Sequence, residues 1–230
     1  NQNDTVIILE KEVENQPTET HFTKTDIVTG EPVVGAVLQI LDEEGNVIRE
    51  WVTTTEEHIE YALPEGNYIL HEETAPNADG YVTAQDVAFT VKEDGSITKV
   101  EMEDDFSKVD VSKTDITGDT ELVGVKLQVL NSEGEVLDEW VTDGTEHRIE
   151  YLPVGEELTL REIQTIDGYT MAEDVKFTLE DTGEVQHVAM QNEFVYGRIF
   201  LTKTDAETGD ALAGAEFEIR NTTTGEVAGT

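Results

Sequence analysis

One motif occurs three times along the chain and determines its organisation. The segment FTKTDIVTGEPVVGAVLQIL (22–41) recurs as VSKTDITGDTELVGVKLQVL (111–130) and again as LTKTDAETGDALAGAEFEI (201–219). The copies start at residues 22, 111 and 201, so they are 89 and 90 residues apart. A fixed spacing of this size indicates tandem domains that each fold as the same unit.

The ends of the repeats can be located from a second motif. VEMEDDF (100–106) matches VAMQNEF (188–194), and VEN (13–15) is similar to an earlier copy of that ending. The chain is therefore expected to be a segment of a longer array of such repeats. Its expected parts are the last strand of a preceding repeat (1–17), two complete repeats (18–107 and 108–196) and the N-terminal hairpin of a truncated repeat (197–230). The hairpin lacks most of its sandwich, so it is expected to be poorly stable alone.

Within each repeat the pattern is all-β. Short alternating runs such as AVLQIL (36–41), YILHE (68–72) and VAFTV (87–91) are separated by turn signals such as EEGN and ADG. No apolar stripe has the length of a helix. About seven short strands per repeat predict a small Ig-like β-sandwich, so the chain is expected to hold such domains in tandem.

The charge of the chain excludes several kinds of partner. The formal net charge is −38, from 52 Asp and Glu against 14 Lys and Arg. This balance repels phosphate backbones and anionic lipids, so neither nucleic acid nor membrane insertion is expected. The acidic residues are spread along the chain, which favours a solvated surface over a calcium site; no metal and no cofactor are expected. The absence of cysteine excludes disulfides.

Polar residues occur on the apolar face of the first and last strands. The first strand of every copy carries a lysine that shares a face with apolar residues, at Lys24, Lys113 and Lys203. The last strand carries Asp104 or Asn192 in the same way. Taken singly, each position is consistent with a snorkelling lysine or a satisfied polar group. Together they indicate that the buried polar residues interact with one another, because burying separate charges costs several kcal/mol per ion.

A glutamate completes the set in each repeat. Glu162 shares a face with Leu160, and by the same alternation Glu72 shares a face with Leu70. Adding the repeat interval of 89 to residue 73 gives 162, which would select Glu73 instead. The turns before these strands differ between the repeats, so we favour the face pattern and assign Glu72.

A lysine, a carboxylic acid and an Asp or Asn in one apolar core predict an isopeptide bond. Desolvation lowers the pKa of a lysine and raises that of a glutamic acid. The neutral amine is then a nucleophile, and the protonated acid can polarise the Asp or Asn carbonyl and relay protons. Folding holds the groups together at high effective concentration. The product is a neutral amide, which is easier to bury than an ion pair.

Three motifs occur in the same order in both complete repeats and resemble a known family. They read KTDIVTGEPVVGA, EETAPNADGY and MEDDF in the first repeat, and KTDITGDTELVGV, REIQTIDGY and MQNEF in the second. This order resembles the CnaB domain, the SpaA-like, prealbumin-like repeat of Gram-positive adhesins and pilins. The resemblance covers nearly the whole chain and implies an intramolecular Lys–Asp/Asn bond assisted by a glutamate.

Carried over by position, the resemblance assigns a role to each polar residue. It implies cross-links between Lys24 and Asp104 with Glu72 as catalyst, and between Lys113 and Asn192 with Glu162 as catalyst. It also implies that Asn15 pairs with a lysine upstream of this sequence, and Lys203 with residues beyond Thr230. In the family the glutamate stands four residues before the proline of the box, and Glu72 stands four before Pro76. Repeat two departs from the pattern, because its box lacks the proline.

The resemblance implies structural stalk or spacer modules of a bacterial cell-surface adhesin or pilin-like protein, located outside the cell at the cell wall. Neighbouring repeats are the expected partners. The alternative is a ligand-binding adhesin module that contacts a host extracellular-matrix or cell-surface protein, with the loop at 72–81 as its candidate site. No turnover enzyme is expected, because the five histidines are scattered and no catalytic motif is present. The bond itself would form once, by autocatalysis.

Overall fold

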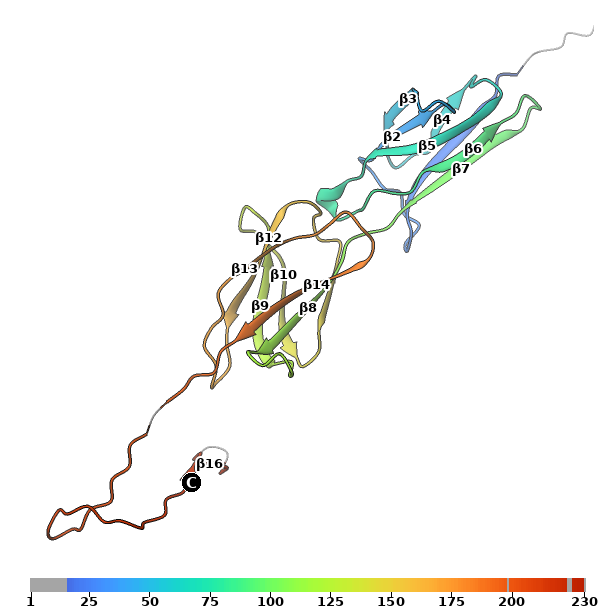
Figure 1. The fold of residues 1–230 in the computed structure, drawn as a ribbon. Coiled ribbons are helices and arrows are strands. Elements are labelled where there is room, and N and C mark those ends of the chain that lie inside the picture. The colour runs from blue at the N-terminus through green and yellow to red at the C-terminus, as the bar shows by residue number, and fades with distance from the viewer. Residues whose placement is uncertain (1–15, 198, 223–224, 230) are drawn as a thin grey trace, which may run out of the picture. The chain divides into compact units, whose positions relative to one another are not determined.

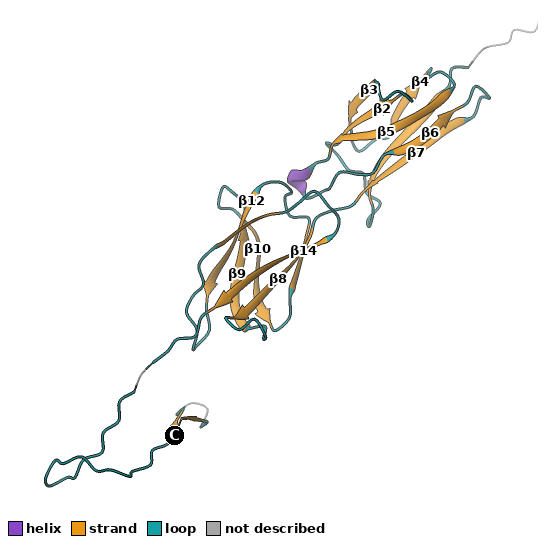
Figure 2. Cartoon of the chain, viewed as in Figure 1, coloured by secondary structure: helices purple, strands orange, loops and turns teal. Residues whose placement is uncertain are grey.

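The computed structural model describes residues 16–197, 199–222 and 225–229. The chain divides into two compact units, with the boundary in the sequence between Phe194 and Val195. The larger unit holds two β-sandwiches, one for each complete repeat (Figures 1 and 2). The all-β prediction of tandem small sandwiches is therefore confirmed.

Repeat one forms two facing sheets. Their strand orders are β4-β1-β7 and β3-β2-β5-β6. The strands are β1 (Glu19–Asp26), β2 (Val37–Leu41), β3 (Val47–Val52), β4 (His58–Tyr61), β5 (Gly66–Thr74), β6 (Val87–Val91) and β7 (Ile97–Asp104). A short 3₁₀ helix, η1 (Asn77–Asp79), follows β5 and is purple in Figure 2.

Repeat two has the same architecture. Its sheets have the orders β11-β8-β14 and β10-β9-β12-β13. The strands are β8 (Lys108–Asp115), β9 (Val123–Leu130), β10 (Val136–Asp143), β11 (His147–Glu150), β12 (Glu157–Gln164), β13 (Val175–Thr178) and β14 (Val185–Asn192). The sequence repeat is thus a repeat of strand order as well.

The first and last strands of each repeat lie side by side and parallel. In repeat one, β1 pairs with β7 so that Lys24 lies opposite Met102 and Asp26 opposite Asp104. In repeat two, β8 pairs with β14 in the equivalent register. Alternate residues of these strands point into the sandwich, as the burial patterns of β1 and β7 show. A long side chain on the first strand can therefore reach a residue on the last strand.

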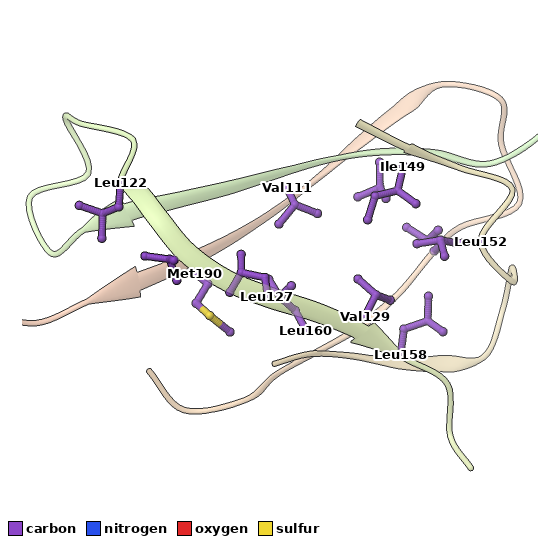
Figure 3. Close-up of a cluster of buried hydrophobic side chains, with 12 residues drawn as sticks. Val111, Leu122, Leu127, Val129, Ile149, Leu152, Leu158, Leu160 and Met190 are labelled. Atoms are coloured by element: carbon purple, nitrogen blue, oxygen red, sulfur yellow. The ribbon is translucent and has the colours of Figure 1, made fainter. Parts of the chain in front are cut away.

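The space between the sheets is filled by aliphatic and aromatic side chains. In repeat one, Phe22, Leu38, Leu70 and Met102 belong to this buried cluster. Figure 3 shows the corresponding cluster in repeat two, where Leu127, Leu160 and Met190 lie close together between the strands. The lysines and their partners are buried in the same sandwiches as these close-packed apolar side chains.

The aspartate of the KTD motif shapes the turn after the first strand. The Oδ1 atom of Asp26 accepts hydrogen bonds from the amides of Val28 and Thr29, at 2.8 and 2.7 Å. Asp205 accepts the corresponding bonds from Glu207 and Thr208 in the third copy. These bonds are local, which explains why the turn is formed in all three copies.

The smaller unit contains two short strands, β15 (Ile219–Arg220) and β16 (Val227–Gly229), paired antiparallel. Its opening turn repeats that of the complete domains, with an isolated bridge between Thr204 and Ala211. Lys203 is exposed in this unit, in contrast to the lysines of the complete repeats. Among the described residues of this unit, none belongs to a buried hydrophobic cluster.

Candidate functional site

In repeat one, a lysine, an aspartate and a glutamate meet inside the sandwich. The Lys24 Nζ atom of β1 donates a hydrogen bond to Asp104 Oδ1 of β7. The same Nζ lies 3.2 Å from Glu72 Oε1, which comes from β5 in the facing sheet. Lys24 is 5%, Glu72 1% and Asp104 0% exposed. Three polar groups are thus held in contact with one another and shielded from solvent.

Repeat two contains the matching arrangement with an asparagine. Lys113 Nζ donates a hydrogen bond to Asn192 Oδ1 and lies 3.6 Å from Glu162 Oε2. Asn192 Nδ2 in turn donates to Glu162 Oε1 at 3.0 Å. All three residues are buried. The amine therefore approaches the carbonyl side of the carboxamide, and the glutamate contacts its nitrogen side.

A β-bulge follows the buried glutamate in each repeat. Between β2 and β5 the pairing shifts, so that Leu38 lies opposite Glu72 but Val37 lies opposite Thr74. The pairing of β9 with β12 shifts in the same way after Glu162. A bulge bends the strand and directs a side chain. Glu72 lies on the buried face as a result of the strand alternation, whereas the Glu73 side chain is 56% exposed.

Backbone amides fix the orientation of both glutamates. The Ala84 amide donates to Glu72 Oε2 at 2.6 Å, and the Ala172 amide donates to Glu162 Oε2 at 2.9 Å. Both amides come from the segment between the box and the next strand. One carboxyl oxygen is thus anchored in each repeat. In repeat one the other oxygen lies near Lys24 Nζ, whereas in repeat two the other oxygen accepts from Asn192 and the anchored one lies near Lys113 Nζ.

In each repeat, burial shifts the pKa of one reacting group in the direction that favours amide formation. Burial raises the pKa of Asp104 to about 7, and the nearby Glu72 adds to this rise, although Lys24 opposes it. In repeat two, burial lowers the pKa of the Lys113 amine, and the charge of Glu162 only partly offsets it. A neutral acid and a neutral amine are the species that condense.

Two buried carboxyl oxygens of the site in repeat one make no hydrogen bond. These are Glu72 Oε1 and Asp104 Oδ2. Glu72 Oε1 is near Lys24 Nζ but outside hydrogen-bonding geometry. Unsatisfied buried oxygens are unfavourable, and a proton shared between the two carboxyls would satisfy both.

Thr165 is a member of the second site that sequence reasoning missed. Asn192 Nδ2 donates to Thr165 Oγ1 at 2.9 Å, in addition to its bond with Glu162. At the equivalent position of the box, repeat one has the buried Ala75. The hydroxyl thus accompanies the carboxamide, which has an N–H to donate, and is missing where an aspartate takes its place. The sequence does hold a sign of this role: the repeat with Asn192 has a threonine at this position of the box, and the repeat with Asp104 has an alanine.

Two predicted residues remain outside these two sites. Asn15 lies outside the described residues, and Lys203 is exposed. The loop at 72–81, the candidate ligand site, contacts repeat two: Asn77 O accepts the Val154 amide at 2.9 Å. Gly80 O of the same loop accepts the Ser107 amide at 2.8 Å.

Two further features bear on other classes of function. Asp110, Glu146 and His187 bring three potential metal ligands within 4.8 Å of one another, but Asp110 is also bonded by Arg148 through two nitrogens. Among the described residues, no helix has the length and apolarity required to cross a membrane.

The lowered pKa of Lys113 predicts a pH effect in a protein that cannot cross-link. In an Asn192→Ala variant the amine stays buried, and the folded state binds its proton less tightly than the unfolded chain does. Stability should therefore rise as the pH increases from the lowered pKa towards the ordinary lysine value of about 10.4. We expect the melting temperature of Asn192→Ala to rise relative to that of Asn192→Ala/Lys113→Met between about pH 7 and about pH 10. A difference between the two variants that does not change with pH would contradict this assignment.

The paired sheets and the parallel first and last strands define a protein built from tandem prealbumin-like β-sandwiches. Residues 18–105 and 107–193 each match the SpaA prealbumin-like fold domain, and the chain belongs to this family. A search of curated proteins found no match.

Similar solved structures include a protein of Bacillus anthracis and two bacterial pilins. The Bacillus anthracis TIE protein is 23% identical with a TM-score of 0.51; the match covers 78% of this chain and 34% of that protein, so the chain spans about a third of its length. The shaft pilin spaA of Lactobacillus rhamnosus GG is 14% identical (TM-score 0.35, covering 80% of this chain and 100% of the pilin). GBS52, the minor pilin of Streptococcus agalactiae, is 17% identical (TM-score 0.37, covering 81% and 100%).

Proposed function

We propose that the two complete repeats are stalk modules of a bacterial cell-surface adhesin or pilin-like protein, each closed by an intramolecular isopeptide bond. The observation that supports this proposal is the contact between Lys Nζ and an Asp or Asn carbonyl oxygen, beside a glutamate, inside both sandwiches. Membership of the SpaA family agrees with the surface location. In a cysteine-free chain such a bond would take the place of a disulfide, worth typically about 2–4 kcal/mol.

In repeat one the proposed reaction joins Lys24 to Asp104 and releases water. The neutral Nζ attacks the Asp104 Cγ atom while Glu72, protonated, donates a hydrogen bond to the Asp104 carboxyl. A C–N bond forms and a C–O bond breaks. Glu72 gives its proton to the departing hydroxyl, which leaves as water, and takes one up from the nitrogen, so it ends in its starting state.

In repeat two the proposed reaction joins Lys113 to Asn192 and releases ammonia. Nζ attacks Cγ from the side of Oδ1, and the C–Nδ2 bond breaks. Glu162 lies 3.6 Å from Nζ and contacts Nδ2 directly, so it is placed to take the proton that Nζ loses and to deliver it to the departing group, which leaves as ammonia. Thr165 accepts from the same nitrogen and holds the carboxamide in this orientation.

The flanking segments are proposed to belong to further repeats. Lys203 lies in a third copy of the KTD motif, and its exposed side chain agrees with a sandwich that is not complete in this sequence. Asn15 lies in a third copy of the ending motif. We infer that each would react with a partner outside the sequence considered, as part of a longer array of modules.

The intact mass of the purified chain tests the cross-links directly. We expect a deficit of one water plus one ammonia relative to the mass calculated from the sequence. Lys24→Ala should restore the water alone, and Glu162→Ala the ammonia alone, because the two sites act independently. Fragmentation of the digested chain should find the peptides of Lys113 and Asn192 joined. An intact chain at its full calculated mass would refute both bonds.

A further inference from the structure

Tyr151 of repeat two makes three contacts with repeat one. It lies directly after β11, and its hydroxyl donates to Asp26 Oδ2 at 2.8 Å. Its ring stacks on Phe106, with centroids 4.0 Å apart and planes inclined by 21°. The same ring meets Tyr81 edge to face at 5.7 Å. One side chain thus combines a charge-assisted hydrogen bond with two aromatic contacts.

Asp26 depends on this contact because it is a buried carboxylate. It is 2% exposed. Burial alone would raise its pKa, but the amides of Thr29 and Val28 and the hydroxyl of Tyr151 outweigh burial, so the pKa is lowered. A buried carboxylate that loses a donor becomes strongly unfavourable. Repeat two therefore supplies a hydrogen bond that repeat one needs.

The backbones at the junction are in direct contact as well. Gly80 has a φ of +84°, and a Cβ atom added to it would lie 2.3 Å from the Tyr151 carbonyl carbon. Ser107 links the two positions, since its amide donates to Gly80 O and its carbonyl accepts the Tyr151 amide at 3.1 Å. Only glycine permits this approach.

A second set of contacts lies beside the first. Asp181 of repeat two accepts hydrogen bonds from the amide and the hydroxyl of Thr83, at 2.8 and 2.6 Å. Lys108 donates to Asp105 and to the carbonyl of Gly183. The junction is therefore a continuous interface of specific polar and aromatic contacts.

Comparison of the two repeats shows which part of the interface is particular to repeat two. Ala62 occupies the position of Tyr151 in repeat one, with a φ of 62° against 60° for Tyr151. Its amide donates to Thr18 O, as the Tyr151 amide donates to Ser107 O. The backbone at this position is thus common to both repeats, whereas the phenol is not.

We propose that Tyr151 is a specificity-determining latch that joins these two repeats in this order and couples their stabilities. The partner recognised by the Asp26, Tyr81 and Phe106 surface is a SpaA-type domain that presents a phenol from a left-handed residue after its fourth strand. A domain with alanine at this position, such as repeat one, cannot supply the hydroxyl or the stacked ring. This proposal is independent of the isopeptide bonds.

Hydrogen exchange of the full chain tests the latch. Tyr151→Ala places in repeat two the residue that repeat one already carries in the same backbone conformation, so repeat two should fold. We expect the Ile27 and Val82 amides of repeat one, which donate to Asp104 O and Asp105 O, to exchange about tenfold faster. Tyr61→Ala removes a tyrosine that is 55% exposed at the far end of β1, and it should leave these two amides unchanged.

A double-mutant cycle separates the hydroxyl from the rest of the interface. Tyr151→Phe removes the donor and Asp26→Asn removes the charge of the acceptor. If the latch is correct, the two changes are non-additive, and the double variant exchanges little faster than either single variant. Changes confined to repeat two in Tyr151→Ala, or fully additive effects in the cycle, would overturn the proposal.

Discussion

Replacing Glu162 by glutamine is expected to lower the melting temperature of repeat two by roughly 20 °C. The proposed bond closes a loop between residues 113 and 192, which are 79 positions apart. In the chain-entropy description, closing a loop of this length stabilises the fold by about 4 kcal/mol. For a domain of this size, each kcal/mol shifts the melting temperature by about 4–8 °C.

Glutamine is chosen because it keeps the shape of the side chain and one oxygen for the Ala172 amide. Scanning calorimetry measures the transition, and intact mass shows whether the ammonia has been retained. Glu193→Gln provides the matched control, because Glu193 is the exposed neighbour of Asn192. A variant that lost the bond but melted within a few degrees of the parent chain would show that the bond contributes little to stability.

Replacing Glu72 by glutamine is expected to abolish the loss of water in repeat one, whereas Glu73→Gln should have no effect. The two residues are adjacent, but Glu72 is 1% exposed and near Lys24 Nζ, while the Glu73 side chain is 56% exposed. Glutamine cannot be protonated as an acid, so it cannot relay a proton between the amine and the leaving hydroxyl.

Comparing Glu72→Gln with Glu73→Gln shows which glutamate the loss of water requires. Intact mass counts the water lost in repeat one, and the loss of ammonia reports that repeat two has folded and reacted. If Glu73→Gln prevented the reaction and Glu72→Gln did not, the interval of 89 residues would have given the correct assignment. If neither did, condensation would proceed without a glutamate.

Strand alternation made much of this arrangement predictable from the sequence. Lys24 and Asp104 each share a parity with apolar neighbours, and a strand must place such residues on one face. The repeated motifs also predicted that the two complete domains share one architecture, as their equivalent strand orders confirm. These are local properties, which a single sequence records directly.

Other features depend on contacts between distant segments and could not be predicted. The bulge after Glu72 arises from pairing between β2 and β5, and the sequence of β5 alone does not reveal it. The loop at 72–81 was a candidate ligand site because its sequence is distinctive, yet it contacts the next domain. Tyr151 was overlooked because its partners lie 125 and 45 positions away, at Asp26 and Phe106.

The parallel pairing of first and last strands determines how a repeat would respond to being pulled from its two ends. The chain enters repeat one at the start of β1 and leaves it at the end of β7, near Asp104. With the proposed bond in place, force passes from Lys24 straight to Asp104 and bypasses the 80-position interval between them. About 270 Å of potential contour length would then stay folded away. Each module would then keep a fixed length when the chain is pulled.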